Sequence, residues 1–255
     1  MSVAATPVLW HIEISHYNEK ARWALDWKGV EHVRKAPQPG LHPLRARRLT
    51  GGATLPVLEL DGRAIGDSTR IIAELEARFP DPPLYPAETT DRRRALEIED
   101  FFDEQVAPDV RRLVFFHVLS SPGAAGSMAE LSRAGPLKAR GLRLALPLVR
   151  RDVKARYGVS AEGAETALTK IRAGLARIED DLQPGGHLVG DGFSVADLTA
   201  AAILAPLARP REYPYPFPTV PPSVHEIRES LEGRALEWVR ETYARHRPPS
   251  AEVGS

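Results

Sequence analysis

The residues best suited to chemistry near the N-terminus follow a short β-rich stretch. Ser15 stands between residues 8–14, which favour a strand, and residues 19–28, whose apolar side chains recur at helical spacing. A hydroxyl at such a turn can donate a hydrogen bond, and a helix N-terminus attracts negative charge. Such a turn would suit an anion, and Ser15 is the first candidate donor there. Tyr17 and Asn18 are further candidate donors, against the alternatives of packing for Tyr17 and helix capping for Asn18.

The same strand suggests a second pair of candidates. Alternate residues of a strand share a face, so His11, Glu13 and Ser15 are predicted to form one row. An unpaired carboxylate in a buried strand is costly. We interpret Glu13 or His11 as facing a ligand cleft, where either could accept a proton. The alternative is a buried network in which they pair with each other, with Arg22 or with Arg70.

A proline begins the next β-rich stretch. Residues 54–57 read Thr-Leu-Pro-Val, and an X-Pro bond costs only about 0.5–1 kcal/mol to hold in the cis form. A cis bond before Pro56 would turn the backbone of Leu55 outward, where its N–H and C=O could pair with an extended peptide. The alternative is an ordinary proline at a strand start.

A third candidate site lies beyond the Asp-Gly hairpin of residues 56–65. Asp67 and Ser68 open a predicted helix over residues 68–79, whose unpaired N–H groups would attract a carboxylate. Either side chain could instead cap that helix. Both roles are compatible.

Composition limits the classes of function. The 255 residues hold 34 Lys plus Arg and 34 Asp plus Glu, so no net field favours nucleic acid. There is no cysteine, which excludes disulfides, thiolate metal sites and a protein thiol nucleophile. The longest mostly apolar run, residues 198–208, is too short to span a membrane, and no secretory signal is visible. We expect a soluble cytoplasmic protein with no nucleic-acid, membrane or metal partner.

The order of patterns predicts two domains. Residues 1–80 read as β-α-β and then β-β-α, with a loop over 36–52, and residues 81–89 form a proline-rich linker. Residues 90–255 are almost entirely helical in pattern, with a flexible break at 120–135 and an extended loop at 209–222. The expected helices cover residues 90–119, 140–157, 162–182, 194–205 and 223–246.

The chain resembles the cytosolic glutathione S-transferase family over nearly its whole length. Three motifs carry the resemblance: SHYNEKARWAL from Ser15, TLPV with GDST from Gly66, and LVGDGFSVAD from Leu188. The resemblance implies an α/β thioredoxin-like N-terminal domain followed by an all-α C-terminal domain, and glutathione as co-substrate. Ser15 matches the serine or cysteine of theta-, phi- and omega-like members. Asn18 departs from relatives that often have cysteine there. The glutathione-binding residues implied are His42, Thr54, Leu55, Pro56, Asp67 and Ser68, with Arg45 or Arg47 as substitutes for His42.

The resemblance also implies a reaction. Ser15 would activate the glutathione thiol for attack on a hydrophobic electrophile, as in detoxification, or for thiol-dependent ether cleavage, dehalogenation or isomerisation. Phe115, Phe116, His117, Tyr213 and Tyr215 are candidates for the electrophile pocket, and a homodimer would place residues 92–102 near its two-fold axis. The rival is a non-catalytic binding protein of the same fold. A disulfide reductase is disfavoured, because the chain lacks cysteine.

Ser194 and Asp197 have the spacing of a helix-capping box. We assign them a structural role, the start of a buried helix, and no catalytic one.

Overall fold

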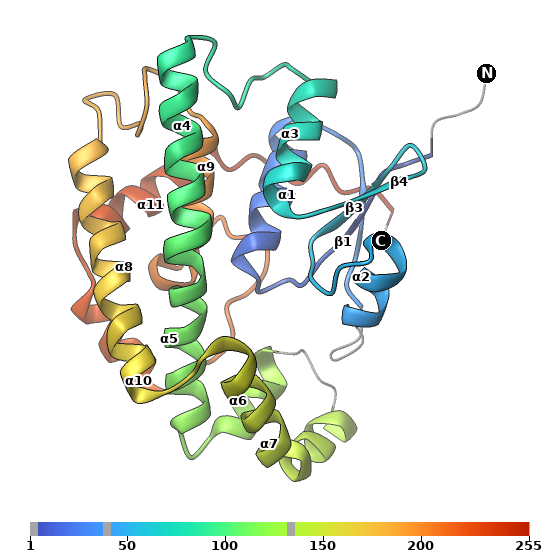
Figure 1. Cartoon of the computed structure of the whole chain (residues 1–255), viewed down its shortest axis with the longest axis vertical. Helices are drawn as coiled ribbons and strands as arrows, with labels where there is room; N and C mark the ends of the chain where they lie inside the picture. The colour runs from blue at the N-terminus through green and yellow to red at the C-terminus, as the bar shows by residue number, and fades with distance from the viewer. Residues whose placement is uncertain (1–4, 38–41, 132–135, 255) are drawn as a thin grey trace.

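The computed structural model describes residues 5–37, 42–131 and 136–254 (Figure 1). Its N-terminal part holds a four-stranded sheet in the order β2-β1-β3-β4. Strand β1 (Val8–Trp10) pairs in parallel with β2 (Val33–Lys35) and antiparallel with β3 (Val57–Leu60), and β3 forms a hairpin with β4 (Arg63–Gly66). The predicted order of strands and helices is confirmed except for an additional helix between β2 and β3, and the first strand ends at Trp10 rather than at residue 14.

Helices cover both faces of this sheet. Leu9 and Leu58 pack with α1 (His16–Trp27) and α3 (Ser68–Arg78), whereas Trp10 and Val57 pack on the opposite face. There α2 (His42–Thr50) contacts β3 and β4, although a loop was expected over residues 36–52. The physical reason is that a proline is tolerated in the first turn of a helix, and that Ala46 can then be buried.

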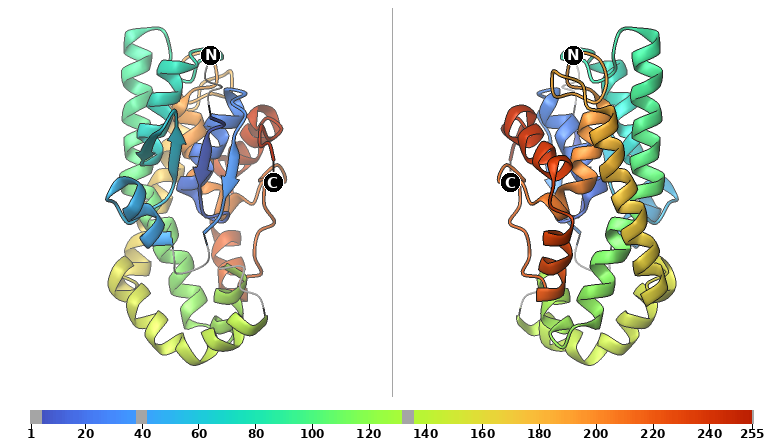
Figure 2. Two further views of the ribbon diagram at one scale, coloured as in Figure 1. Left: turned by 90° about the vertical axis from the view of Figure 1, so that its right-hand side faces the viewer. Right: turned by 90° about the vertical axis from the view of Figure 1, so that its left-hand side faces the viewer.

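The second part is helical, as predicted, and begins with a long rod. Helix α4 (Thr89–Phe101), a π-helical turn (Phe102–Val106) and α5 (Ala107–Ser120) follow one another without a break. The remaining helices are α6 (Ala124–Leu131), α7 (Pro136–Tyr157), α8 (Ala161–Asp181), α9 (Val195–Ala208), α10 (Pro222–Ser230) and α11 (Arg234–His246). Figure 2 shows α6 and α7 at the end of the molecule away from the start of α4.

Two boundaries differ from the prediction. The expected break at 120–135 contains α6, while its last four residues lie outside the described residues. The single helix expected over 223–246 is two helices, because the chain turns at residues 231–233 and Gly233 is the N-cap of α11. Glycine lowers helix stability in an interior position by about 1 kcal/mol, which favours a break there.

Nearly every residue of α9 is buried, and this helix packs against α1, α4, α5 and α11. It therefore joins the two parts into one core. Its start has the predicted capping box: Asp197 Oδ2 accepts hydrogen bonds from the N–H and the hydroxyl of Ser194, both at 2.9 Å. Asp197 Oδ1 also accepts from the Leu188 N–H at 2.8 Å.

We expect Asp197→Ala to lower the free energy of unfolding by about 2–4 kcal/mol, because it removes the cap and leaves the buried Leu188 and Ser194 amides unpaired. Urea denaturation followed by circular dichroism measures this change. Ligand affinity of the folded variant should be unaltered. A normal unfolding midpoint together with lost ligand binding would contradict the structural role.

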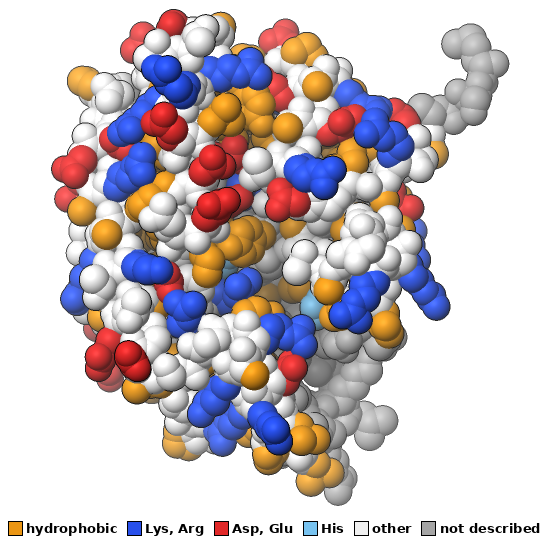
Figure 3. All heavy atoms as spheres, viewed as in Figure 1, with side chains coloured by type: hydrophobic (Ala, Val, Ile, Leu, Met, Phe, Trp, Pro, Cys, Tyr) orange, Lys and Arg blue, Asp and Glu red, His pale blue; other side chains and the backbone are white. Residues whose placement is uncertain are grey.

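The end of the chain returns to the sheet. The Val253 N–H donates to the His32 carbonyl at 2.8 Å, beside β2, and the Ala251 N–H donates to Asp26. None of the helices that the structure describes has the length and apolar character needed to cross a bilayer. On the face seen in Figure 3, acidic and basic side chains are interspersed, in keeping with the equal numbers of the two.

Candidate functional site

A cavity of about 980 Å³ lies between the two parts of the chain. The N-terminal part contributes the end of the β1–α1 connection, the start of α2, the segment before β3 and the start of α3. The helical part contributes the π-helical turn, one face of α5, the end of α7 and the segment between α9 and α10. Of the sequence-predicted residues, those that line the cavity are Ser15, Tyr17, His42, Thr54, Leu55, Pro56, Asp67, Ser68 and Phe115.

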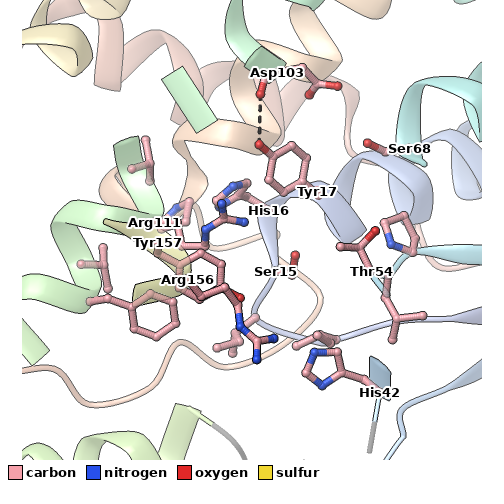
Figure 4. A pocket seen from close by; sticks show the side chains of 18 of the residues that line it. Ser15, His16, Tyr17, His42, Thr54, Ser68, Asp103, Arg111, Arg156 and Tyr157 are labelled. Atoms are coloured by element: carbon pink, nitrogen blue, oxygen red, sulfur yellow. Dashed lines mark hydrogen bonds between the residues drawn. The ribbon is translucent and has the colours of Figure 1, made fainter. Parts of the chain in front are cut away.

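Ser15 lies at the N-terminus of α1, near the middle of the view in Figure 4. Its Oγ accepts a hydrogen bond from Asn18 Nδ2 at 2.7 Å and makes no capping bond to its own helix. The hydroxyl hydrogen of Ser15 is therefore available to an acceptor in the cavity, beside the positive end of the α1 dipole. This is the arrangement expected of a group that stabilises an anion.

The other two candidate donors are engaged elsewhere. Asn18 is fully buried and does not line the cavity, and its second amide hydrogen goes to the Leu55 carbonyl at 3.2 Å. The Tyr17 hydroxyl donates to the Asp103 carbonyl at 3.0 Å (Figure 4), and burial raises the pKa of Tyr17 to about 12. Of these three residues, Ser15 is thus the one with a donor hydrogen that has no acceptor among the described residues.

The row predicted for His11, Glu13 and Ser15 does not form, because the strand ends at Trp10 and Glu13 lies in a turn. Neither His11 nor Glu13 lines the cavity. His11 Nδ1 lies 2.9 Å from Arg22 Nη1, and burial with the adjacent guanidinium lowers the pKa of His11 to about 2. In the structure, His11 and the Glu13 carbonyl therefore belong to the buried network with Arg22, and neither residue faces the cleft.

The backbone before β3 is presented to the cavity. The Leu55–Pro56 peptide bond is cis, as predicted. The Leu55 carbonyl is not open to a ligand, since it accepts from Asn18. The Leu55 N–H, however, has no acceptor among the described residues. One backbone donor, rather than the predicted donor and acceptor pair, is therefore available to an extended ligand.

The start of α3 forms the next wall of the cavity. Asp67 caps the helix, accepting from the Arg70 N–H at 3.2 Å, and holds a left-handed backbone with φ of 74°. A residue other than glycine in this region costs about 1–3 kcal/mol and is typical of functional sites. Ser68 is buried and lines the cavity beside the unpaired first amides of the helix.

His42 lies at the opposite end of the cavity from Ser68 (Figure 4). Burial, reinforced by the Arg156 guanidinium, lowers the pKa of His42 below its usual value. Arg156, at the end of α7, lines the same cavity and was missed in the sequence. Arg45 is not a substitute, because its guanidinium stacks 3.8 Å from the centre of the Trp10 ring and pairs with Glu59, and Arg47 does not line the cavity.

A buried ionic network supports the other end of the site, where α3 meets the π-helical turn. Lys20 Nζ lies 3.2 Å from Glu99 Oε1 and 2.7 Å from Asp103 Oδ2, and the Thr69 hydroxyl lies 3.0 Å and 2.9 Å from the same two carboxylate oxygens, so it can donate to either. Lys20 and Glu99 are wholly buried. The π-helical turn carries Asp103, and such turns are frequent at functional sites because they re-aim a side chain.

The helical part contributes a wall that the sequence analysis found only in part. Phe115 lines the cavity, whereas Phe116, His117, Tyr213 and Tyr215 do not. The Tyr213 hydroxyl instead contacts Arg22 and the Glu13 carbonyl. The lining residues that were missed include His16, Arg111 and Tyr157. The signal for Arg111 was its position beside Val110, Val114 and Phe115, which helical spacing places on one face.

Two family models match the chain. The model of the glutathione S-transferase N-terminal domain matches residues 9–83, and that of the C-terminal domain matches residues 149–244. A search of curated proteins finds no match.

Solved structures share the fold. The beta-etherase LigF from Sphingobium sp. strain SYK-6 is 22% identical with a TM-score of 0.62, covering 93% of this chain and 100% of that one. A theta class glutathione S-transferase from Xanthomonas axonopodis pv. citri, with glutathione bound, is 20% identical with a TM-score of 0.58, covering 96% and 99%. A glutathione S-transferase from Methylobacterium radiotolerans, in complex with glutathione sulfonate, is 21% identical with a TM-score of 0.55, covering 98% of both chains. Since the two domain models match in the family's order and the sheet and helices are arranged accordingly, this chain belongs to the glutathione S-transferase family.

Proposed function

We propose that this protein is a glutathione transferase in which Ser15 holds the glutathione thiol as a thiolate for attack on a hydrophobic electrophile. The observation that carries the proposal is that one cavity is lined by the Ser15 hydroxyl, by Leu55, whose N–H has no acceptor among the described residues, and by the start of α3. These three groups match an anionic sulfur, a peptide carbonyl and a carboxylate. Family membership supplies the tripeptide that carries all three.

Glutathione would lie extended between α3 and α2. Its γ-glutamyl carboxylate takes the first amides of α3 and the Ser68 hydroxyl, while Asp67 receives the ammonium group. The cysteinyl carbonyl accepts from Leu55, as in strand addition. The glycyl carboxylate lies near His42, which stays neutral at pH 7 and offers a hydrogen bond, while Arg156 provides the positive charge.

Activation of the thiol is assigned to Ser15, with Asn18 as a positioning residue. Lowering a thiol pKa by about two units requires about 2.7 kcal/mol of preferential stabilisation of the anion. A charge-assisted hydrogen bond from Ser15, together with the N-terminus of α1, is sufficient for this. Because Asn18 donates to Ser15 Oγ, the Ser15 hydrogen is directed to the remaining acceptor, the sulfur.

The chemical step is then a substitution. The thiol proton leaves to solvent, the thiolate sulfur forms a carbon–sulfur bond with the electrophile, and the leaving group departs with its bonding electrons. Addition to an epoxide follows the same course, except that the oxygen that takes the electrons of the broken C–O bond stays on the product and is protonated by solvent. A homodimer with residues 92–102 near its two-fold axis completes the proposal.

The binding step is tested with Asp67→Asn. Asparagine can still cap α3 and tolerates a positive φ, so the fold should be retained while the charge is lost. Asp67 is exposed, and we expect affinity for glutathione to fall by about 3- to 10-fold in calorimetric titration. Affinity for glutathione lacking its α-amino group should be unchanged by the substitution.

Turnover with an aryl halide and with an epoxide completes this test. Glutathione binding with turnover of either electrophile supports the proposal. Binding without turnover of any electrophile would favour a non-catalytic protein of this fold. Failure to bind glutathione would overturn the proposal.

A further inference from the structure

The charged groups that line the cavity are separated along the chain. The acidic ones come from the start of α3 and the stretch around the π-helical turn, and are Asp67, Asp100, Asp103 and Glu104. The guanidinium groups come from the helical part beyond that turn, and are Arg111, Arg156, Arg209 and Arg228. In Figure 4, Ser15 lies between Asp103 and Ser68 on one side and Arg111, Arg156 and Tyr157 on the other. An electrophile approaching Ser15 from the side of Arg111 and Arg156, on α5 and α7, therefore meets positive charge.

Arg111 differs from the other three arginines. Arg156 pairs with Asp152, Arg228 Nε donates to the Leu207 carbonyl at 2.8 Å, and Arg209 lies over the Phe217 ring. Arg111 makes no hydrogen bond or ion pair with the described residues, and its buried Nε has no acceptor. A partly buried cation without a counter-ion is unfavourable, so this position favours an anionic ligand.

The groups that touch Arg111 do not supply that anion. Its guanidinium lies 4.3 Å from the centre of the Tyr157 ring and 5.9 Å from that of Tyr17. His16 lies beside it in Figure 4, and the buried His16 Nε2 also lacks a partner among the described residues. Burial, then Arg111 and Lys20, lowers the pKa of His16 to about 3, so it adds no charge at neutral pH.

The wall next to Arg111 is aromatic and aliphatic. The rings of Phe115 and Tyr157 stack with centroids 5.5 Å apart and planes 9° apart, and Val110 and Val114 line the cavity from the same face of α5. A flat ring packs well on such a surface, because aromatic side chains bury large apolar areas with defined geometry. The guanidinium at its margin presents several donors in a planar fork that matches a carboxylate.

We propose that the electrophilic substrate is an aromatic compound bearing a carboxylate, with its ring against Phe115 and Tyr157 and its carboxylate on Arg111. This inference rests on the proposed glutathione transfer and assigns the class of its second substrate. The carboxylate is held by Arg111 without taking part in the reaction. The ring carbon that carries the leaving group then faces Ser15 and the thiolate.

The test compares two probes that differ in charge, a chlorodinitrobenzoate and the matching chlorodinitrobenzamide. We expect wild-type kcat/KM to favour the benzoate. In Arg111→Gln, kcat/KM for the benzoate should fall by about 10- to 100-fold, and that for the benzamide by less than about 3-fold. Arg111→Lys, which keeps the charge but not the fork, should lie between. Arg172→Gln, an exposed arginine of α8, is the matched control and should leave both unchanged.

Equal losses for the two probes, or no loss for the benzoate, would overturn the inference. Calorimetric binding of each probe to wild type and Arg111→Gln, with glutathione sulfonate present, gives the same comparison without turnover. If glutathione sulfonate does not bind, the proposed function fails, and titration of the probes alone still tests Arg111. Thermal melts of the variants establish that each is folded.

Discussion

Ser15→Ala should lower kcat/KM for any electrophile by about 100-fold or more and raise the pKa of bound glutathione by about one to two units. Of the three candidate donors, Ser15 is the one with a hydrogen that has no acceptor among the described residues, whereas Tyr17 and Asn18 are engaged elsewhere. The thiolate pKa is measured from its ultraviolet absorbance during a pH titration of the complex. Affinity for glutathione should change much less than turnover.

The substitution should cost only about 1 kcal/mol of stability, because Ser15 makes no side-chain capping bond to α1 and its loss leaves one amide hydrogen of the buried Asn18 without its acceptor. Thermal melting of the variant should therefore lie close to that of Ser230→Ala, a control in which an exposed hydroxyl far along the chain is removed. Unchanged turnover and an unchanged thiol pKa in Ser15→Ala would contradict the assignment. So would a large loss of stability, since Ser15 would then have a structural role.

The fold was largely predictable, because its signals are local. The Asp-Gly hairpin, the alternation around it and the capping box at Ser194 each depend on neighbouring residues. The errors arose where a local pattern was ambiguous. The proline and arginine content of residues 36–52 indicated a loop, but the same residues form α2 once Ala46 packs against the sheet.

The candidate site was predictable on one side only. Ser15, Leu55 and Asp67 are placed by turns and helix starts that the sequence displays. Helical spacing places Arg111 on one face with Phe115, but that this face of α5 and Tyr157 of α7 meet at the cavity depends on long-range packing, which no local pattern shows. The roles expected for His11 and Glu13 failed for a related reason. The alternation of side chains holds only within a strand, and β1 ends at Trp10, before Glu13. Glu13 lies in a turn, where its carbonyl accepts a hydrogen bond from Arg22.

Lys20→Met should lower the free energy of unfolding by about 3–5 kcal/mol at neutral pH, because it leaves the buried carboxylates of Glu99 and Asp103 without their cation. Burial already raises the pKa of Glu99, and Lys20 acts against that shift. Loss of Lys20 therefore raises the pKa of Glu99 further. Lys170→Met, which removes a half-exposed partner of Asp109, is the matched control and should cost less than about 1 kcal/mol.

The pH dependence gives this prediction its sign. A carboxyl whose pKa is higher in the folded state binds more protons there, so its folded form loses stability as pH rises from the unfolded pKa through the folded one. Lys20→Met should thus be less destabilised near about pH 5 than near about pH 8. Adding Glu99→Gln removes the uncompensated charge and should restore part of the stability at the higher pH. Urea denaturation at several pH values measures both effects, and a loss that is the same at every pH and is not relieved by Glu99→Gln would show that Lys20 acts through packing alone.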